Sequence, residues 1–228
     1  QRDANKRYGF SAKETLNIMQ RLYEHYKVLT YPRTDSRYIG SDIVPTIKER
    51  LKACNIGPYK AYIPALLKAP IRTGKAFVDD KKVSDHHAII PTEEYVQLDH
   101  MSNEERKIYD LVVRRFISVL YPVYEYEQTT MKATVQTSAK PSVAAAVFGA
   151  KGQIVLKEGW KAVYDNMSLD EEEDDKSGDQ LRLAGQQLPA LKKGQEVDIS
   201  QIMRSQGKTK PPARFTEATL LSAMENPV

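Results

Sequence analysis

Hydrophobic positions near the start of the chain repeat with the spacing of an α-helix. Ser11 and Glu14 form a Ser-x-x-Glu pair, the pattern of a capping box that begins a helix. Behind this pair, apolar side chains recur three or four residues apart, at Leu16, Met19, Leu22 and Tyr23. The basic stretch QRDANKRYG before it ends in Gly9, and glycine commonly ends a helix. We therefore predict two helices within residues 1–27. They are either the entry of a helix-turn-helix or simply two packed helices.

The pattern is shorter and less regular up to about residue 125. Val28–Tyr31 is a β-like run that Pro32 stops. Residues 55–64, NIGPYKAYIP, are predicted to be a loop because they contain one glycine and two prolines. Residues 68–92 are predicted to be irregular or to form short strands. Two further helices are expected, one capped by Ser41 and running to about Cys54, the other opened by Ser102-Asn-Glu-Glu and running to about Leu120.

From Tyr124 the apolar positions alternate with polar ones, which is typical of β-strands. Three stretches with glycine-containing turns show the pattern, at residues 125–139, 143–164 and 180–206. They predict an antiparallel β unit. PPARFTEATLLSAMENPV then predicts a new helix that begins at Thr216 and Glu217. The chain is thus expected to have a mixed helix-and-strand part to about residue 125, a β unit to about 205, and the opening of a third element.

Composition places the chain in the soluble globular class, with 41% hydrophobic and 28% charged residues. Its 228 residues suffice for one large domain or two modest ones. No apolar run is long enough for a membrane span and no secretory leader is visible, so the start resembles the middle of a longer protein. Cys54 is the single cysteine, which excludes disulfides within the chain and thiolate zinc sites. Such cysteine usage suggests a reducing, cytoplasmic setting.

The charge is unevenly distributed. The net charge is +4, but residues 170–175, Asp-Glu-Glu-Glu-Asp-Asp, carry six negative charges. Without them, 34 basic and 24 acidic residues leave +10 on the rest of the chain, which would attract phosphate backbones. The acidic run is expected at a solvated, mobile hairpin tip. It is a poor metal site because consecutive residues point in different directions.

The first cluster of candidate catalytic residues lies in the segment LTYPRTDSRYI. Pro32 favours an extended conformation at Tyr31, and Arg33 would then project to the same side. A phenol needs a cation or a base to act as a nucleophile at neutral pH, and an arginine fork suits phosphate oxygens. Asp35 and Arg37 are candidates to orient Arg33 or to bind adjacent phosphates. The alternative is a buried core tyrosine at a strand end, followed by surface charges.

Two further clusters contain candidates. In SDHHAIIPT, His86 and His87 precede an apolar run, and histidine can bind or protonate phosphate near neutral pH. On a strand they would face opposite sides, so they are poor ligands for one metal; alternatively one is packed and the other exposed. In KTKPPARFTEATL, Arg214 and Thr216 lie at a helix start, where free N–H groups can receive a phosphate. Taken alone, this is a helix cap with a nearby arginine.

Together these clusters resemble the type IA DNA topoisomerases, in order and in approximate separation. LTYPRTDSRYI is similar to the family's active-site tyrosine motif, HHAIIPT to its histidine motif, and PPARFTEATLLSAME to its later arginine motif. QRDANKRYGFSAKETLNIMQRLYE is similar to the helical segment before the tyrosine. Proline at 32 and the His-His pair are closer to topoisomerase III than to bacterial topoisomerase I.

The resemblance implies roles for these residues. Tyr31 would attack a phosphodiester of single-stranded DNA and become joined to the 5′ phosphate, so that strand passage and religation need no ATP. Arg33 would position the phosphate, with Asp35 supporting it, and His86 would contact phosphate or move a proton. The remaining candidates for the DNA path are Gln1, Arg2, Lys6, Arg7, Arg37, Thr92, Arg214 and Thr216.

The resemblance also implies an α+β multidomain fragment. Residues 1–127 would be the tyrosine-bearing domain with a winged-helix-like core, 128–207 part of an antiparallel β arch, and 208–228 the start of a helical DNA-binding domain. The family's Toprim domain, which carries the Mg²⁺ ligands, has no counterpart here, so no cofactor is expected within this chain. We therefore expect the isolated chain to be inactive in relaxation.

The resemblance implies a monomeric, cytoplasmic, nucleoid-associated bacterial enzyme. Its partners would be single-stranded DNA and the Toprim domain of the same polypeptide, with no membrane. Two other classes of protein stay open on the residues alone. One is a non-catalytic helix-turn-helix module that binds DNA, and the other is a structural or interaction domain without a nucleic-acid role.

Overall fold

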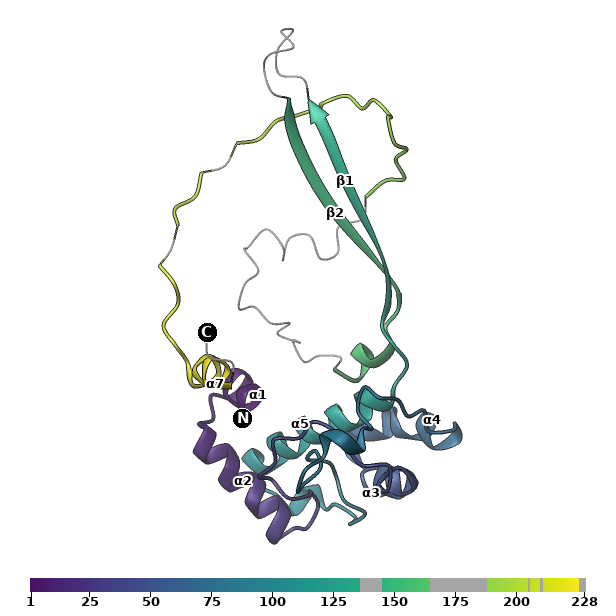
Figure 1. Ribbon diagram of the computed structural model, residues 1–228, viewed down its shortest axis with the longest axis vertical. Coiled ribbons are helices and arrows are strands. Elements are labelled where there is room, and N and C mark those ends of the chain that lie inside the picture. Colours follow the sequence, from purple (N-terminus) through teal and green to yellow (C-terminus); the bar gives the residue numbers. More distant parts are fainter. Residues whose placement is uncertain (136–144, 165–187, 205, 210, 226–228) are drawn as a thin grey trace. The chain divides into compact units, whose positions relative to one another are not determined.

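The computed structural model describes residues 1–135, 145–164, 188–204, 206–209 and 211–225 (Figure 1). The chain divides into two compact units. Unit 1 comprises Gln1–Pro122, Trp160–Tyr164 and the described residues from Pro212 onward. Unit 2 comprises Val123–Gly159 and the described residues between Asp165 and Pro211. Both helices and strands are present, as predicted. The winged-helix character and the three domain boundaries stay predictions.

The first two helices form as the sequence predicts. Helix α1 spans Arg2–Tyr8 and ends at Gly9, whose φ of 71° is the left-handed conformation that glycine adopts most easily. Helix α2 spans Ala12–Glu24 and begins with the reciprocal capping box of Ser11 and Glu14. Its buried residues are Thr15, Ile18, Met19 and Leu22. The helical period is thus confirmed for Met19 and Leu22, whereas Leu16 is half-buried and Tyr23 is exposed at the edge of the buried face.

Helices between residues 41 and 68 begin at prolines rather than at Ser41. A 3-10 helix, η1, spans Val44–Thr46 and leads into α3, Ile47–Ala53. The prediction that Ser41 caps this helix is wrong, because Ile43 and Thr46 precede η1 and α3 and neither helix has a side-chain cap, while the Ser41 N–H donates to Asp80 Oδ1 at 2.6 Å. The loop predicted for residues 55–64 is also wrong in part, since η2 spans Gly57–Ala61 and α4 spans Ile63–Lys68. In each case proline lies in the first turn, where its missing N–H leaves no helical hydrogen bond unmade.

The long helix α5 spans Asn103–Leu120 and forms the centre of the core of unit 1. Its Ser102 and Glu105 capping box is present, which confirms the prediction. Its buried side chains Ile108, Val113 and Ile117 are at most 2% exposed. Tyr109 donates to the Sγ of Cys54 at 3.4 Å, and burial raises the pKa of that thiol to about 11. Between α4 and α5 the chain forms only two single turns, η3 at Asp80–Lys82 and η4 at Leu98–His100.

Unit 2 is built on a two-stranded antiparallel ribbon. Strand β1 spans Glu125–Val135 and β2 spans Ala146–Lys157, with Glu127 opposite Ile154 and Val135 opposite Ala146. This pairing confirms residues 125–135 of the first predicted strand, whose residues 136–139 lie outside the described residues, and most of the second. The end of the second stretch instead forms a 3-10 helix, η5, Gly159–Tyr164. Residues 188–204 contain no strand, so that part of the third prediction is wrong. The acidic run at 170–175 lies outside the described residues.

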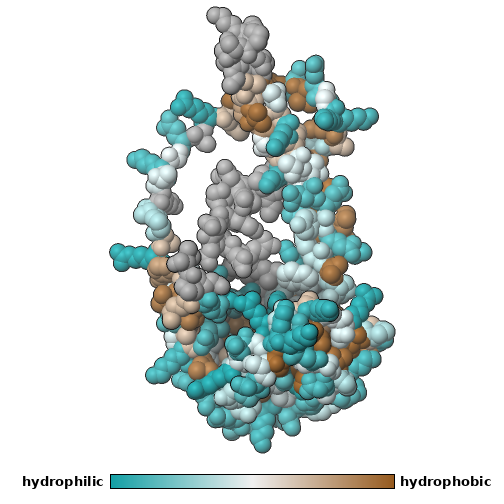
Figure 2. Space-filling view, in the orientation of Figure 1, coloured by the Kyte–Doolittle hydropathy of each residue, from teal (hydrophilic) through white to brown (hydrophobic). Residues whose placement is uncertain are grey.

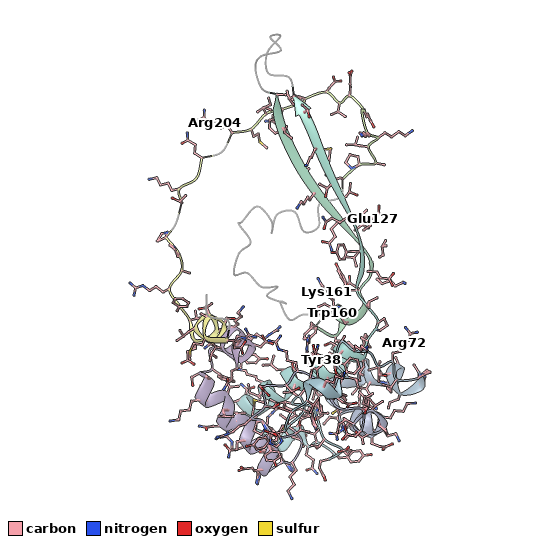
Figure 3. The ribbon with its side chains drawn as sticks, in the orientation of Figure 1. Tyr38, Arg72, Glu127, Trp160, Lys161 and Arg204 are labelled. Atoms are coloured by element: carbon pink, nitrogen blue, oxygen red, sulfur yellow. The ribbon has the colours of Figure 1, made fainter. Side chains whose placement is uncertain are left out.

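Helix η5 belongs to unit 1 rather than to the ribbon. The N–H of Trp160 donates to the carbonyl of Pro122 at 2.9 Å, and its ring meets that of Tyr164 edge-on at 6.1 Å. Figure 3 labels Trp160 and Lys161 on this turn. In the view of Figure 2 the surface of unit 1 is mainly hydrophilic, with small hydrophobic patches. In the part of the chain that the structure describes, no helix combines the length and the apolar character that a membrane span requires.

Glu105 links the start of α5 to α2 and the turn that follows it. Arg21 Nε lies 2.8 Å from Glu105 Oε1, and the Tyr26 hydroxyl and the Ser102 N–H donate to Oε2 at 3.0 and 2.9 Å. Burial works to raise the pKa of Glu105, but the hydrogen bonds from Arg21, Ser102 and Tyr26 outweigh it and hold that pKa below its usual value.

We predict that Glu105→Gln lowers the free energy of unfolding by about 1–2 kcal/mol at pH 7, because hydrogen bonds to a charged acceptor are lost. The lowered pKa stabilises the fold above the ordinary glutamate pKa of about 4.3, and this contribution disappears as pH falls through the lowered value. Urea unfolding at neutral and acidic pH would measure the difference, which should shrink in acid. Glu104→Gln, at an exposed position of the same turn, is the matched control and should change the midpoint much less.

Candidate active site around Tyr31

The backbone around Tyr31 is held by a segment about 60 residues further along the chain. The N–H of Thr30 donates to the carbonyl of Ile90 at 3.0 Å, and the N–H of Thr92 donates to the carbonyl of Val28 at 3.1 Å. Leu29 and Pro91 form an antiparallel bridge between these bonds. The β-like run predicted at Val28–Tyr31 is therefore one bridge long. This pairing fixes the backbone immediately before Tyr31.

Two threonine hydroxyls bring the histidine segment to the tyrosine. Thr30 Oγ1 accepts from the N–H of Ile90 at 2.9 Å, and Thr34 Oγ1 donates to the carbonyl of His86 at 2.9 Å. The ring centroids of Tyr31 and His86 are consequently 4.4 Å apart, with planes tilted by 42°. The structure thus places side by side the two side chains that the sequence marked in separate motifs.

Tyr31 is half-buried and is also contacted by a second aromatic ring. Tyr23, on α2, meets it edge-on at a centroid distance of 5.5 Å and an angle of 80°. Tyr31 lines two cavities. One, of about 620 Å³, is bordered by Glu24, Glu93 and Glu94, and the other, of about 230 Å³, by Asp42, Asp85 and His87 as well as His86. The Tyr31 ring therefore has two aromatic neighbours and also borders two open cavities.

The charged residues after Pro32 project into solvent. Pro32 is buried, whereas Arg33, Asp35 and Arg37 are exposed. Within the described residues, Asp35 forms no ion pair with Arg33, so the expected support of one by the other is not present in this structure. The Arg33 guanidinium is thus available to an incoming phosphate two residues from Tyr31.

The other sequence candidates separate into different surroundings. Thr92 lines the larger Tyr31 cavity, but its hydroxyl donates to the carbonyl of Lys27 at 2.6 Å. Arg2, on α1, donates to Ser222 at 2.7 Å and lies 3.3 Å from the carboxylate of Glu225. Both partners belong to α7, Glu217–Glu225, which packs against α1 (Figure 1). This packing favours the interpretation of α1 as a packed helix over that of a helix-turn-helix entry.

The start of α7 matches the expected helix cap. Thr216 Oγ1 accepts from the N–H of Thr219 at 3.2 Å, and Asn5 on α1 accepts from the N–H of Ala218. The N-terminal N–H groups of α7 are thus partly satisfied within unit 1. Arg214, Lys6 and Gln1 are exposed, and Arg7 is half-exposed. They form a second group of candidates around α1 and α7, distinct from the group around Tyr31.

Arg50 is a residue that sequence reasoning missed. Its guanidinium donates to the carbonyl of Pro91 at 2.8 Å, lies 2.8 Å from the carboxylate of Glu93, and donates to Thr46 Oγ1 at 2.8 Å. Burial lowers the pKa of Arg50, and Glu93 offsets this in part. The signal was present, since an arginine between Ile47 and Leu51 lies on the apolar face of α3.

The described residues contain no group of three histidine, cysteine, aspartate or glutamate side chains arranged to hold a metal ion. His86 and His87 line one cavity with Asp42 and Asp85, yet they do not converge on one point. The described residues therefore do not fit the Mg²⁺ of the family, and its ligands stay an expectation for a Toprim domain.

Comparison with known proteins gives the class to which this site belongs. A sequence model described as DNA topoisomerase matches residues 1–227, so the chain belongs to the DNA topoisomerase family. Proteins named DNA topoisomerase 3 are similar over 227 residues, with 55% identity for a Bacillus cereus strain, 56% for Bacillus anthracis and 51% for Bacillus subtilis (strain 168). They cover 100% of this chain, which spans about 29% of their length. The resemblance to a type IA, topoisomerase III-like protein is thereby confirmed.

We predict that Arg50→Ala lowers the free energy of unfolding by about 2–3 kcal/mol, because three hydrogen bonds of a buried charge are lost together. Arg50→Lys should restore little, since an ammonium cannot reach three acceptors arranged for a planar fork. Urea unfolding would measure both changes. Lys52→Ala, on the same helix, removes an exposed pair with Glu49 and should leave stability nearly unchanged. Equal effects of the two alanine variants would contradict this role of Arg50.

Proposed function

We propose that this chain carries the tyrosine half of a type IA DNA topoisomerase active site, with Tyr31 as the nucleophile. The observation that carries the proposal is the position of the Tyr31 ring, which contacts the rings of both Tyr23 and His86, two residues before the exposed Arg33. A core tyrosine would be enclosed on all sides. Tyr31 is half-buried and borders two cavities, as a residue that meets an external phosphate must be.

In the proposed step, the Tyr31 phenol oxygen attacks the phosphorus of a phosphodiester in single-stranded DNA. A bond forms between that oxygen and phosphorus, and the bond between phosphorus and the 3′ oxygen breaks. The phenol loses its proton and the 3′ oxygen gains one, which leaves a 5′ phosphotyrosine and a 3′ hydroxyl. One ester replaces another, so resealing by the reverse reaction needs no ATP.

The neighbouring side chains have complementary roles in this proposal. Arg33 would hold the phosphate and stabilise the charge that develops on it, since arginine is permanently charged and binds oxygens with a fork of donors. His86, whose ring lies against Tyr31, would contact the phosphate or transfer a proton. Thr34 contributes indirectly, because its bond to the His86 carbonyl keeps that ring in place. Mg²⁺ would add positive charge at the phosphate of the intact enzyme, through ligands that the described residues do not supply.

The activity of the whole protein is part of the same proposal. The intact polypeptide would bind single-stranded DNA, open one strand at Tyr31, pass another strand and reseal the break. It would act in the bacterial cytoplasm as a monomer. The relatives named DNA topoisomerase 3, which match the whole chain, support this proposal.

We predict that Tyr31→Phe in the intact polypeptide abolishes the covalent protein–DNA adduct, because phenylalanine has no oxygen to form the ester. The adduct would be trapped with detergent on a labelled single strand and detected by its altered migration in a gel. Noncovalent binding of the same strand should be retained within about twofold, since the phenol oxygen contributes little to backbone contacts. Tyr95→Phe, which makes the same change at an exposed site, should leave the adduct intact. An adduct that persists in Tyr31→Phe would overturn the proposal.

The isolated 228-residue chain should not relax supercoiled plasmid, with or without Mg²⁺. It should still bind single-stranded oligonucleotides, and this binding should weaken steeply with salt, since lysine and arginine contacts release counterions. Gel analysis of plasmid topology and fluorescence anisotropy at several salt concentrations would measure the two properties. Relaxation by this chain alone would contradict the division of the active site between two domains. Binding that does not respond to salt would favour a domain without a nucleic-acid role.

A further inference from the structure

Unit 1 contains a cavity of about 410 Å³ beyond Tyr31, where the segment that follows the tyrosine crosses α5. The N–H of Ile39 donates to the carbonyl of Phe77 at 2.9 Å, and the N–H of Ala88 donates to the carbonyl of Tyr38 at 2.8 Å. These bonds place three chain segments side by side above Phe116 of α5. The volume lies in the range of small-molecule sites, about 300–1,000 Å³.

The wall of this cavity is mainly aliphatic and includes three aromatic rings, those of Tyr38, Phe77 and Phe116. Phe116 is 4% exposed, whereas Tyr38, Phe77 and Ile89 are half-exposed and leave ring and aliphatic surface open to solvent. Tyr38 is held in place, because Lys82 Nζ donates to its hydroxyl at 3.0 Å and lies 4.4 Å from its ring centroid. A flat aromatic group would bury the open surface against these rings.

Two arginines at the cavity favour a ligand that carries negative charge. Arg37 and Arg115 both line it and are exposed, and in the part of the chain that the structure describes neither has a salt-bridge partner. This differs from Arg114, one residue away, whose guanidinium pairs with Asp110 at 2.9 Å. Unpaired arginines beside an aromatic wall fit a ligand that joins a flat ring to an anion.

We propose that this cavity binds one nucleotide of the single strand that Tyr31 cleaves, with the base against Phe77 and the flanking phosphates on Arg37 and Arg115. The inference rests on the proposed function, which supplies the strand. Arg37 follows Tyr31 by six residues, so the two lie at most about 20 Å apart, a reach of a few nucleotides. The cavity would thus hold the strand in register beside the cleavage point and add preference at one base.

The test is a binding scan with the intact polypeptide in the Tyr31→Phe background, so that it does not depend on cleavage. Each short single-stranded oligonucleotide would carry one abasic site, and the site would move along the strand from one oligonucleotide to the next. The cleavage point would be located with the protein that retains Tyr31, from the covalent adduct it forms with the labelled strand. At one position the missing base should weaken binding about tenfold, the usual range for a base stacked on an aromatic ring. In Phe77→Ala that position should lose its penalty, because the ring no longer stacks on the base.

Arg115→Gln should weaken binding of the complete strand several-fold. It should also reduce the slope of log affinity against log salt concentration by the amount expected for about one phosphate contact. Arg106→Gln is the matched control, since Arg106 is an exposed arginine on the same helix that does not line the cavity and donates to the carbonyl of Met101, while the Arg72 labelled in Figure 3 is too near Phe77 in sequence to serve. Unfolding midpoints of all variants would show that each is folded. The proposal is overturned if no abasic position shows weaker binding that disappears in Phe77→Ala. A covalent adduct that still forms in Tyr31→Phe would instead overturn only the proposed function.

Free deoxynucleotide monophosphates supply the second arm of the experiment. Each would be titrated into the protein while intrinsic fluorescence is followed. Weak binding that Arg115→Gln reduces, together with the abasic penalty, is expected if the cavity holds one unit of a longer strand. Tight binding of a free nucleotide without any abasic penalty would assign the cavity to a soluble ligand and would overturn the assignment to the DNA strand.

Discussion

The candidate site depends on one short stretch of backbone pairing, between residues 28–31 and 88–92. Two backbone hydrogen bonds and one bridge hold the chain just before Tyr31 against the segment just after His87. So short a pairing has little stability of its own. It persists because Arg50 binds the carbonyl of Pro91 from the buried side and Thr30 closes the other end. The buried Arg50 thus fixes the backbone of the site, whereas the exposed arginines stay free for phosphate.

Charge near Tyr31 is arranged against what a phosphate alone would favour. Glu24, Glu93 and Glu94 border one cavity at the ring together with Lys27, and Asp42 and Asp85 border the other, while Arg33 projects into solvent. Five carboxylates against one lysine at these cavities would weaken the attraction of an incoming strand unless further positive charge meets them. This arrangement supports the proposal that a second, cation-bearing part completes the site, in line with relatives of which this chain spans about 29%.

The fold could be predicted from the sequence where a local rule decides the outcome. Both capping boxes and the glycine after α1 appear where the pattern puts them, because each satisfies helix-end groups with residues close in sequence. The errors lie where a distant partner decides. The helix expected after Ser41 begins only at Val44, while the Ser41 backbone is bound by the distant Asp80, and the alternating residues 188–204 form no strand because alternation alone supplies no hydrogen-bond partner.

The candidate site shows the same difference between features set by local rules and features set by distant partners. Tyr31, Arg33 and His86 were identifiable because each residue type suits phosphate chemistry within its own motif, but no local rule brings Tyr31 to His86 across 55 positions. That distance is closed by the hydroxyls of Thr30 and Thr34, whose partners are backbone groups of the other motif. Motif order therefore identified the candidate reacting groups, whereas the residues that position them became visible only through contacts. The cavity at Arg115 extends this argument, since its arginine lies in an ordinary helix and gains meaning only from the aromatic wall that the Tyr31 segment brings to it.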